Sequence, residues 1–222
     1  DFDGTVNLLD RDADDDGFAD GAEVAHGSDP ADEASFPSGL AMEQGRISVG
    51  SSWSLVQLGR TFADPVVVAG PLSLGDPEPA VVRVRNVTST GFEVRVQEFD
   101  YQGDWHGTET LSYLVMERGA AALLDGTVVE AGTFETGSTS FATHAFAASF
   151  PTTPVVMASV TSANEADAVL GRIRNVSPGG FDFALQEEEG NWQSHARETV
   201  SYIAWEPTTG TVNGLAYQVG VT

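Results

Sequence analysis

The chain contains no cysteine and no lysine, and it has no long apolar segment. Without cysteine, neither a disulfide framework nor a thiol site can form, so the fold must rest on its core or on metal ions. No apolar run approaches the roughly 18 residues of a membrane-spanning helix. The ten basic residues are all arginine, and they stand against 33 acidic ones. The net charge of -23 argues against nucleic acids and anionic membranes as partners.

These bounds favour an extracellular protein, secreted or on the cell surface, over a cytosolic enzyme. A length of 222 residues allows one to three small domains. The chain opens inside an acidic motif and shows no signal-peptide pattern. We therefore expect a segment excised from a longer protein.

Two stretches of the chain, 83–117 and 172–206, carry the same pattern at a constant offset of 89 residues. The first begins Arg-Val-Arg-Asn-Val-Thr-Ser-Thr-Gly-Phe, and the second begins Arg-Ile-Arg-Asn-Val-Ser-Pro-Gly-Gly-Phe. The copied positions include arginines, a Gln-Glu pair, a histidine and two further glutamates, although no core requires these polar residues. The pattern predicts a supersecondary unit copied in tandem, with a shared surface task.

From about residue 38, short runs of β-branched and aromatic residues alternate with Gly, Pro and Ser, which is typical of an all-β sandwich. We expect two antiparallel sandwiches, 38–122 and 123–222. The strands predicted for the first are 42–49, 53–58, 65–73, 80–88, 91–99 and 110–118. Those predicted for the second are 129–136, 140–147, 154–162, 168–177, 180–188 and 199–206.

Alternation along these strands assigns one face to the core and the other to solvent. In the first copy, valines and Phe92 point inward, and a polar ladder points outward: Arg83, Arg85, Glu93, Arg95 and Gln97. Cross-strand pairing on a wet surface would explain this ladder without any further role.

A short glycine-bounded element occurs three times, at 39–45, 126–132 and 214–220. It opens each copy, so the third occurrence is the first strand of a further copy or a strand that pairs at an open edge of the second. The sequence leaves both alternatives open.

The N-terminal segment 1–37 holds 12 of the 33 acids and one arginine. Within it, Asp-x-Asp-x-Asp-Gly-Phe-x-Asp-x-x-Glu matches the spacing of a calcium loop, with the glycine for the sharp turn and the terminal acid as a bidentate ligand. The predicted Ca²⁺ ligands are Asp12, Asp14, Asp16, the carbonyl of Phe18, Asp20 and Glu23. A clipped second loop precedes it, with Asp1, Asp3, Thr5, Asn7 and Asp10.

This segment resembles the thrombospondin type 3 repeats of bacterial secreted proteins, in which Asp-x-Asp-x-Asp-Gly units end in a Gly-Ser/Thr-Asp-Pro turn. That turn is Gly-Ser-Asp-Pro at 27–30. The resemblance implies a calcium-rigidified spacer over about residues 1–37.

Each sandwich resembles an H-type lectin domain of the agglutinins. The resemblance rests on Gly-Arg-Ile-Ser-Val-Gly at 45–50, Pro-Val-Val-Val at 65–68, Ser-Thr-Gly-Phe at 89–92 and Leu-Ser-Tyr-Leu-Val-Met-Glu at 111–117, with counterparts in the second copy. It implies an antiparallel sandwich that binds carbohydrate, often as a trimer. Arg83 and Arg172 match the arginine that contacts sugar in that family, while the other sugar-contacting positions do not carry over.

The loops 99–109 and 188–198 predict a sugar site on chemical grounds. Both carry a tryptophan, a histidine and several carboxylates or carboxamides, and such residues stack on sugar rings and pair with hydroxyl groups. Loops on a rigid sandwich commonly carry binding sites. The candidate residues are Tyr101, Trp105, His106 and Glu109 in the first loop, and Trp192, His195 and Glu198 in the second.

Three function classes remain open. A non-catalytic carbohydrate-binding or adhesive module is the first, and an assembly module whose polar ladder mediates contacts between subunits is the second. An enzyme acting on glycosides is the third, with Glu98 and Glu109 or Glu187 and Glu198 as its carboxylate pair. We predict the first, a carbohydrate-binding or adhesive module without catalytic activity.

Overall fold

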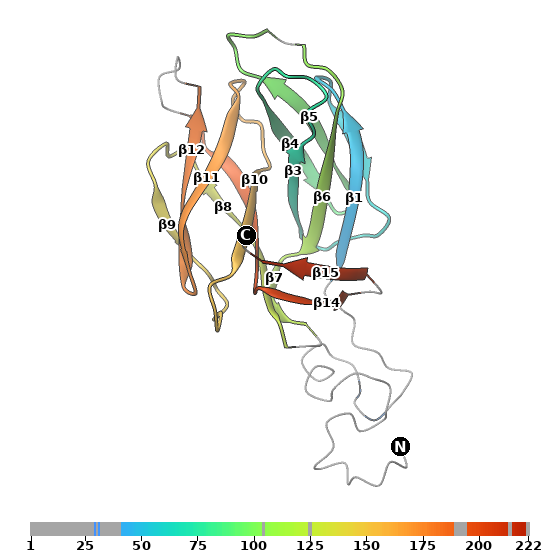
Figure 1. The fold of residues 1–222 in the computed structure, drawn as a ribbon, viewed down its shortest axis with the longest axis vertical. Helices are drawn as coiled ribbons and strands as arrows, with labels where there is room; N and C mark the ends of the chain where they lie inside the picture. Colours follow the sequence, from blue (N-terminus) through green and yellow to red (C-terminus); the bar gives the residue numbers. More distant parts are fainter. Residues whose placement is uncertain are drawn as a thin grey trace.

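The computed structural model describes residues 29, 31, 41–103, 105–123, 126–188, 195–212 and 215–220. All the regular secondary structure in these residues consists of antiparallel strands, joined by turns and loops, which confirms the all-β prediction (Figure 1). No helix capable of crossing a membrane occurs in this part of the chain.

The first sandwich consists of a sheet in the order β1-β6-β3 and a second in the order β2-β5-β4. β-branched and aromatic residues dominate these strands, because such side chains pack well on a pleated surface. Their bounds are β1 Met42–Val49, β2 Ser54–Gln57, β3 Pro65–Leu72, β4 Ala80–Thr88, β5 Gly91–Glu98 and β6 Glu109–Glu117.

The second sandwich repeats this order of strands, with sheets β10-β13-β8-β7 and β11-β12-β9. It lies beside the first, with all four sheets running roughly along the long axis (Figure 1). Its strands are β7 Gly119–Ala122, β8 Val128–Thr136, β9 Ala142–Ala145, β10 Val155–Val160, β11 Val169–Ser177, β12 Gly180–Glu187 and β13 Glu198–Trp205.

Two short hairpins flank the second sandwich. β7 lies within the segment 38–122 predicted as the first repeat, yet it pairs with β8 of the second. After β13, strand β14 (Thr208–Val212) pairs with β15 (Leu215–Val219) in a separate two-stranded sheet. The third glycine-bounded element is therefore the second strand of a hairpin and does not extend a sheet of the second sandwich.

Each sandwich encloses its own apolar core between its two sheets. Phe92, Val94 and Val96 of β5 are buried in the first core, and Phe181 and Phe183 of β12 are buried in the second. Both sets alternate along their strands with polar residues, as period-two patterning requires.

A third cluster of buried residues joins the two sandwiches. Val66 and Val68 of β3 contribute to it from the first sandwich, and Val129, Ile203 and Trp205 contribute from the second. Ser159 of β10 adds a polar connection, because its Oγ accepts a hydrogen bond from the backbone N of Ala69 at 2.9 Å and donates to the carbonyl of that residue at 3.3 Å.

The prediction of a uniformly solvated outer face is wrong for Arg83. Its side chain points away from the first core, as alternation requires, but only 1 % of the residue is exposed. The second sandwich covers Arg83. The outer face of the first sandwich is therefore buried at this point, between the two sandwiches. Arg172 at the equivalent position is exposed.

Candidate functional site: a buried Glu-His-Glu network and the arginine it receives

In the first sandwich, a histidine lies buried between two glutamates at one end. His106 belongs to the loop between β5 and β6, and its Nδ1 is 3.1 Å from Oε1 of Glu98 at the end of β5. Its Nε2 is 3.4 Å from Oε1 of Glu109 at the start of β6. Because β5 and β6 belong to different sheets, the histidine ties the ends of the two sheets together.

The second sandwich holds the same arrangement. Nδ1 of His195 lies 2.7 Å from Oε1 of Glu187, and its Nε2 lies 3.1 Å from Oε1 of Glu198. The side chains of all three residues are at most 1 % exposed. Copying these residues at the 89-residue offset has therefore copied a buried network.

A neutral imidazole has one donor and one acceptor nitrogen, whereas both nitrogens of His195 face carboxylate oxygens. The imidazolium satisfies both carboxylates. Burial opposes this charge, but the hydrogen bonds to Glu198 and Glu187 outweigh burial and raise the pKa of His195. The network in the second sandwich is accordingly an ionic one.

Glu109 also gathers the loop that follows β3. It accepts hydrogen bonds from the Ser73 hydroxyl, from the Gly75 backbone N at 2.8 Å and from the Asp76 backbone N at 2.7 Å. The Ser73 hydroxyl and the Gly75 amide contribute most to lowering the pKa of Glu109 to about 2. The ionised carboxylate thus holds the loop 73–78 in place.

Glu198 gathers the equivalent loop of the second sandwich. The Ser162 hydroxyl donates to it, and the Asn164 backbone N lies 3.0 Å from both carboxylate oxygens. Burial favours the neutral acid, yet the hydrogen bonds from His195 and Ser162 leave the pKa of Glu198 lowered.

The loop 162–167 receives Arg83 of the first sandwich. The guanidinium donates to the carbonyl of Asp167, to the carbonyl of Glu165 at 3.1 Å and to Oε1 of Glu198 at 3.4 Å. Gln97 on the neighbouring strand donates to the carbonyl of Ala166 at 2.6 Å. Two side chains of the predicted polar ladder therefore bind the second sandwich.

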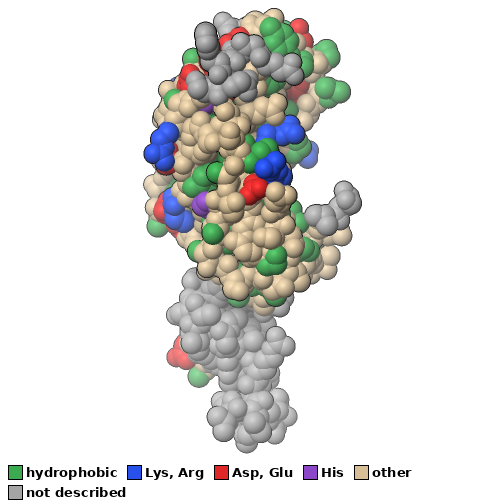
Figure 2. Space-filling view, turned by 90° about the vertical axis from the view of Figure 1, so that its left-hand side faces the viewer, with side chains coloured by type: hydrophobic (Ala, Val, Ile, Leu, Met, Phe, Trp, Pro, Cys, Tyr) green, Lys and Arg blue, Asp and Glu red, His purple; other side chains and the backbone are tan. Residues whose placement is uncertain are grey.

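Arg172 makes no equivalent contact with any residue that the structure describes. It projects from β11 of the second sandwich, as Arg83 projects from β4 of the first. Figure 2 faces the second sandwich and shows basic side chains exposed at mid-height of the described part. The two copied arginines thus differ in environment and not in strand position.

The predicted sugar-site residues separate into two groups. Tyr101 and Trp105 are 69 % and 75 % exposed, and the ring of Tyr101 stacks on Phe99 with centroids 6.2 Å apart. Trp192 lies outside the described residues, as do all the predicted calcium ligands in 1–23.

The second group is buried, which corrects the expectation that these side chains are available to contact a sugar. His106 and Glu109 are 3 % and 1 % exposed, and His195 and Glu198 are 8 % and 0 % exposed. Their polar atoms bind one another and the loop backbone. Burial follows because each histidine lies between two glutamates at the ends of strands that belong to different sheets.

Sequence reasoning missed the receiving loop 162–167. The copied Gln-Glu pairs at 97–98 and 186–187 were a signal for a network, but the loops themselves differ, as Gly-Asp-Pro-Glu at 75–78 and Asn-Glu-Ala-Asp at 164–167. Glu165 and Asp167 contribute backbone carbonyls to Arg83, and a carbonyl leaves no trace in residue identity.

Glu165, Glu187 and His195 place one ligand atom each within 4.8 Å of one another, which is compact enough to hold a metal ion. A nitrogen ligand does not suit calcium, which takes oxygen ligands. In this structure the ring Nδ1 of His195 already binds Glu187. The cluster therefore acts as a hydrogen-bonded ion pair and lends no support to a second calcium site.

No known protein family matches the chain, and no solved structure matches it. The chain is similar to halomucin of Haloquadratum walsbyi (strain DSM 16790 / HBSQ001), with 35 % identity over 177 residues. The match covers 74 % of this chain but spans only 2 % of the length of halomucin.

The two Glu-His-Glu networks together predict that the protein is most stable in mildly acidic solution. The pKa of Glu109 is lowered from 4.5 to about 2, so its contribution is present above pH 4.5 and is lost as the pH falls toward 2. The pKa of His195 is raised from 6.5, so its contribution is present below pH 6.5 and is lost as the pH rises through the raised value. We expect the free energy of unfolding to peak between these limits.

Urea denaturation across pH 3 to 9 measures this profile. Glu109→Gln should flatten the acid limb, and His195→Gln should flatten the alkaline limb. An unchanged profile in both variants would show that the two groups do not carry the pH dependence.

Proposed function

We propose that this chain is a non-catalytic structural module of a large extracellular protein, in which two sandwiches act as one rigid body. The observation that supports this most directly is the burial of Arg83 in the loop 162–167. A flexible pair of domains would leave this arginine in water, because burying a guanidinium is costly unless hydrogen bonds and an opposite charge compensate it.

The apolar contact between the sandwiches supports the same role. The cluster around Ile203 and Trp205 is continuous with residues of β3 and is as fully buried as the core of either unit. Interfaces of this apolar kind hold domains in a fixed orientation, whereas polar ones allow movement.

The buried carboxylates support a non-catalytic role. A glycoside hydrolase needs two carboxyl groups that flank an open site. Glu98 and Glu109 share His106, and Glu109 is also bound by the loop 73–76, so this pair does not face an open cleft.

The similarity to halomucin and the composition support an extracellular location within a much longer protein. The surplus of acidic residues keeps such a protein soluble but strains the folded state by self-repulsion. Salt screens this repulsion, with a Debye length of about 3 Å at 1 M. The ion pair of Arg83 is buried and is therefore less exposed to screening than surface pairs.

A carbohydrate-binding role is the second candidate, and the exposed ring of Trp105 favours it. Trp105 and Tyr101 lie on the same loop of the first sandwich, and both are largely exposed. Exposed aromatic rings of this kind can stack on sugar C-H groups.

The rigid-body role predicts different effects for the two copied arginines. Arg83→Ala should lower the free energy of unfolding by about 3 kcal/mol, because it leaves Glu198 and two carbonyls of the loop 162–167 without their donor. Arg172→Ala is the matched control, and it should change the value by less than about 0.5 kcal/mol because its side chain is exposed. Urea denaturation measures both, and equal effects would contradict the proposal.

The calcium-spacer proposal concerns the segment 1–37. Glu23→Gln removes the bidentate ligand of the predicted loop, so isothermal titration calorimetry of the whole chain should show calcium affinity reduced at least tenfold. Binding that is equally tight in the parent chain and in Glu23→Gln would refute the assignment.

The sugar proposal predicts that Trp105→Ala weakens retention on immobilised polysaccharides. A single aromatic platform binds only in roughly the millimolar range, so affinity electrophoresis is the suitable measurement. Leu74→Ala is a control, because Leu74 is 86 % exposed on a different loop. Equal migration of the parent and Trp105→Ala on every polysaccharide tested would refute the sugar proposal, and only the structural role would remain.

A further inference from the structure

The ring nitrogen Nδ1 of His195 faces more negative charge than one proton balances. Oε1 of Glu187 lies 2.7 Å from it, and Oε2 of Glu165 lies 3.5 Å from it. A protonated Nδ1 carries a single hydrogen, which serves one of these oxygens well and the other poorly. A divalent cation in place of that hydrogen is attracted by both carboxylates at once.

The distances in this cluster suit a zinc ion. With Zn–N and Zn–O bonds of about 2.1 Å, tetrahedral geometry places the ligand atoms about 3.4 Å apart. The two distances from Nδ1 of His195, 2.7 and 3.5 Å, lie on either side of this value. All three ligand atoms lie within 4.8 Å of one another, so small rotations of the glutamate side chains bring them to a common centre.

The other ring nitrogen of His195 is already held as it is in zinc sites. A histidine that binds a metal almost always donates its second N–H to a carboxylate or a carbonyl, which fixes the tautomer and the ring orientation. Nε2 of His195 lies 3.1 Å from Oε1 of Glu198. Glu198 is in turn held by the Ser162 hydroxyl and the Asn164 amide. The ring is thus oriented with Nδ1 toward the two remaining glutamates.

The charges of the network favour a divalent cation at Nδ1. Three carboxylates surround the ring, those of Glu165, Glu187 and Glu198, and Arg83 contacts the last of them. With a protonated His195, two positive charges face three negative ones. A divalent cation in place of the Nδ1 proton gives three positive charges, and the sum becomes zero. Burial is costly for charges that are not compensated, so this substitution stabilises the network.

Glu165 connects the cluster to solvent. Its side chain is 33 % exposed, whereas those of Glu187 and His195 are at most 1 % exposed. An ion can therefore enter along Glu165, and a water molecule can complete the coordination of three protein ligands. Imidazole nitrogen suits zinc, whereas calcium and magnesium take oxygen ligands. The ligand set thus selects a zinc-like ion over the alkaline-earth ions.

The equivalent position of the first sandwich carries Asp76 in place of Glu165. Both acids accept a hydrogen bond from the backbone of the facing loop, Asp76 from the Gly107 amide at 2.9 Å and Glu165 from the Ala196 amide. Glutamate is longer by one methylene group, and Oε2 also lies 3.5 Å from the histidine ring. Among the described residues, a group of three metal-ligating side chains occurs in the second sandwich and not in the first.

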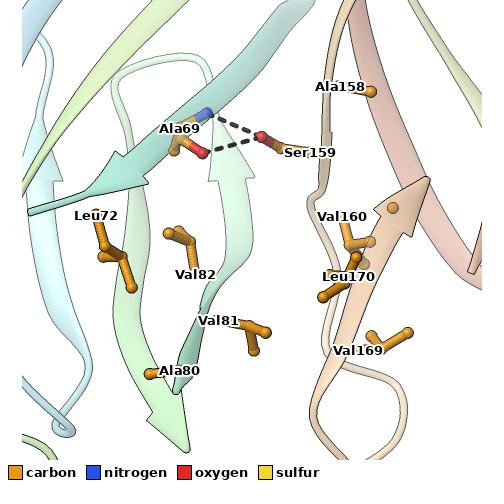
Figure 3. Close-up of a pocket in the computed structure, with 11 residues that line it drawn as sticks. Ala69, Leu72, Ala80, Val81, Val82, Ala158, Ser159, Val160, Val169 and Leu170 are labelled. Carbon is orange, nitrogen blue, oxygen red and sulfur yellow. Dashed lines mark hydrogen bonds between the residues drawn. The ribbon is translucent and has the colours of Figure 1, made fainter. Parts of the chain in front are cut away.

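The same glutamate takes part in the contact between the sandwiches. The backbone carbonyl of Glu165 accepts a hydrogen bond from Arg83 at 3.1 Å. Its loop 162–167 joins β10 to β11, and both strands line a groove of about 260 Å³ opposite β4. Figure 3 shows Val169 of β11 on one side of this groove and Val81 of β4 on the other. An ion bound to the side chain of Glu165 therefore fixes the loop that receives Arg83.

We propose that Glu165, Glu187 and His195 form a zinc site in the second sandwich. Nδ1 of His195 and one oxygen of each glutamate bind the ion, and water takes the fourth position. The bound ion fixes the loop 162–167 to the end of β12. This site goes beyond the proposed structural role, because the burial of Arg83 does not require a metal.

Zinc titration of the untagged 222-residue chain, stripped of metals with a chelator and desalted, tests the site by isothermal titration calorimetry. Glu165→Gln should weaken zinc binding roughly tenfold or more, because it removes one anionic ligand. The glutamine keeps an oxygen for the Ala196 amide, so the loop stays folded. Asp76→Asn is the matched control, because it makes the same change at the equivalent position of the first sandwich, and it should leave zinc affinity unchanged.

Nuclear magnetic resonance supplies a readout that identifies the ligand. Zinc should shift the ring resonances of His195 and leave those of His106 in place, and an equal concentration of calcium should shift neither. Equal zinc affinity in the parent chain and in Glu165→Gln would overturn the proposal. Zinc-induced shifts that are equal at His106 and His195 would also overturn it, because they would show adventitious binding only.

The zinc site and the rigid-body role fail separately. Arg83→Ala measured with a chelator present tests the rigid-body role alone. If Arg83→Ala destabilises the chain while Glu165→Gln leaves zinc binding unchanged, only the zinc site is excluded. If Glu165→Gln weakens zinc binding while Arg83→Ala is neutral, the site stands and the rigid-body role is wrong.

Discussion

The buried carboxylate of Glu198 is the interaction on which the arrangement of this molecule depends. It binds the imidazole of His195, the loop 162–167 and the guanidinium of Arg83 at the same time. The first contact ties the sheets of one sandwich, the second shapes a loop, and the third joins the two sandwiches. Interior, loop and interface are thereby coupled through one side chain.

Burying so many charges is costly unless they compensate one another. In the second sandwich, two glutamates face one imidazolium and one guanidinium, so the four buried charges cancel. Each of the two carboxylates also has a hydrogen-bond partner, which a buried ionic network requires. In the absence of disulfides, such a network defines a unique relative position for two sandwiches that apolar packing alone would orient less specifically.

The duplicated unit explains why similar sequences have different roles. Both units carry the copied arginine, but Arg83 is buried against the second unit and Arg172 is exposed. Whether a given face is buried depends on the neighbour and not on the unit. The loop after β5 adds the largely exposed rings of Tyr101 and Trp105.

Much of the fold follows from residue order alone. The strand predicted at 80–88 is β4, Ala80–Thr88, and the strand predicted at 180–188 is β12, which ends one residue earlier at Glu187. Period-two alternation is enough to locate these strands, because a strand in one of two packed sheets places every second side chain in the core between them. The left-handed backbone of Asn86 and Asn175, with φ of 50° and 51°, recurs at the same point of the repeat, where asparagine tolerates this conformation.

Residue order determines only part of the candidate site. The sequence by itself determined which polar residues are copied, and therefore that Glu, His and Arg belong to a common unit. Only the tertiary structure decided that His106 is enclosed, that Arg83 is buried and that Arg172 is exposed. These two arginines have the same place in a strand, and similar residues follow them in sequence, as Arg-Val-Arg-Asn-Val and Arg-Ile-Arg-Asn-Val, so the copied pattern does not distinguish them. Their difference arises from which surface the other sandwich covers, and that is a property of the assembled chain.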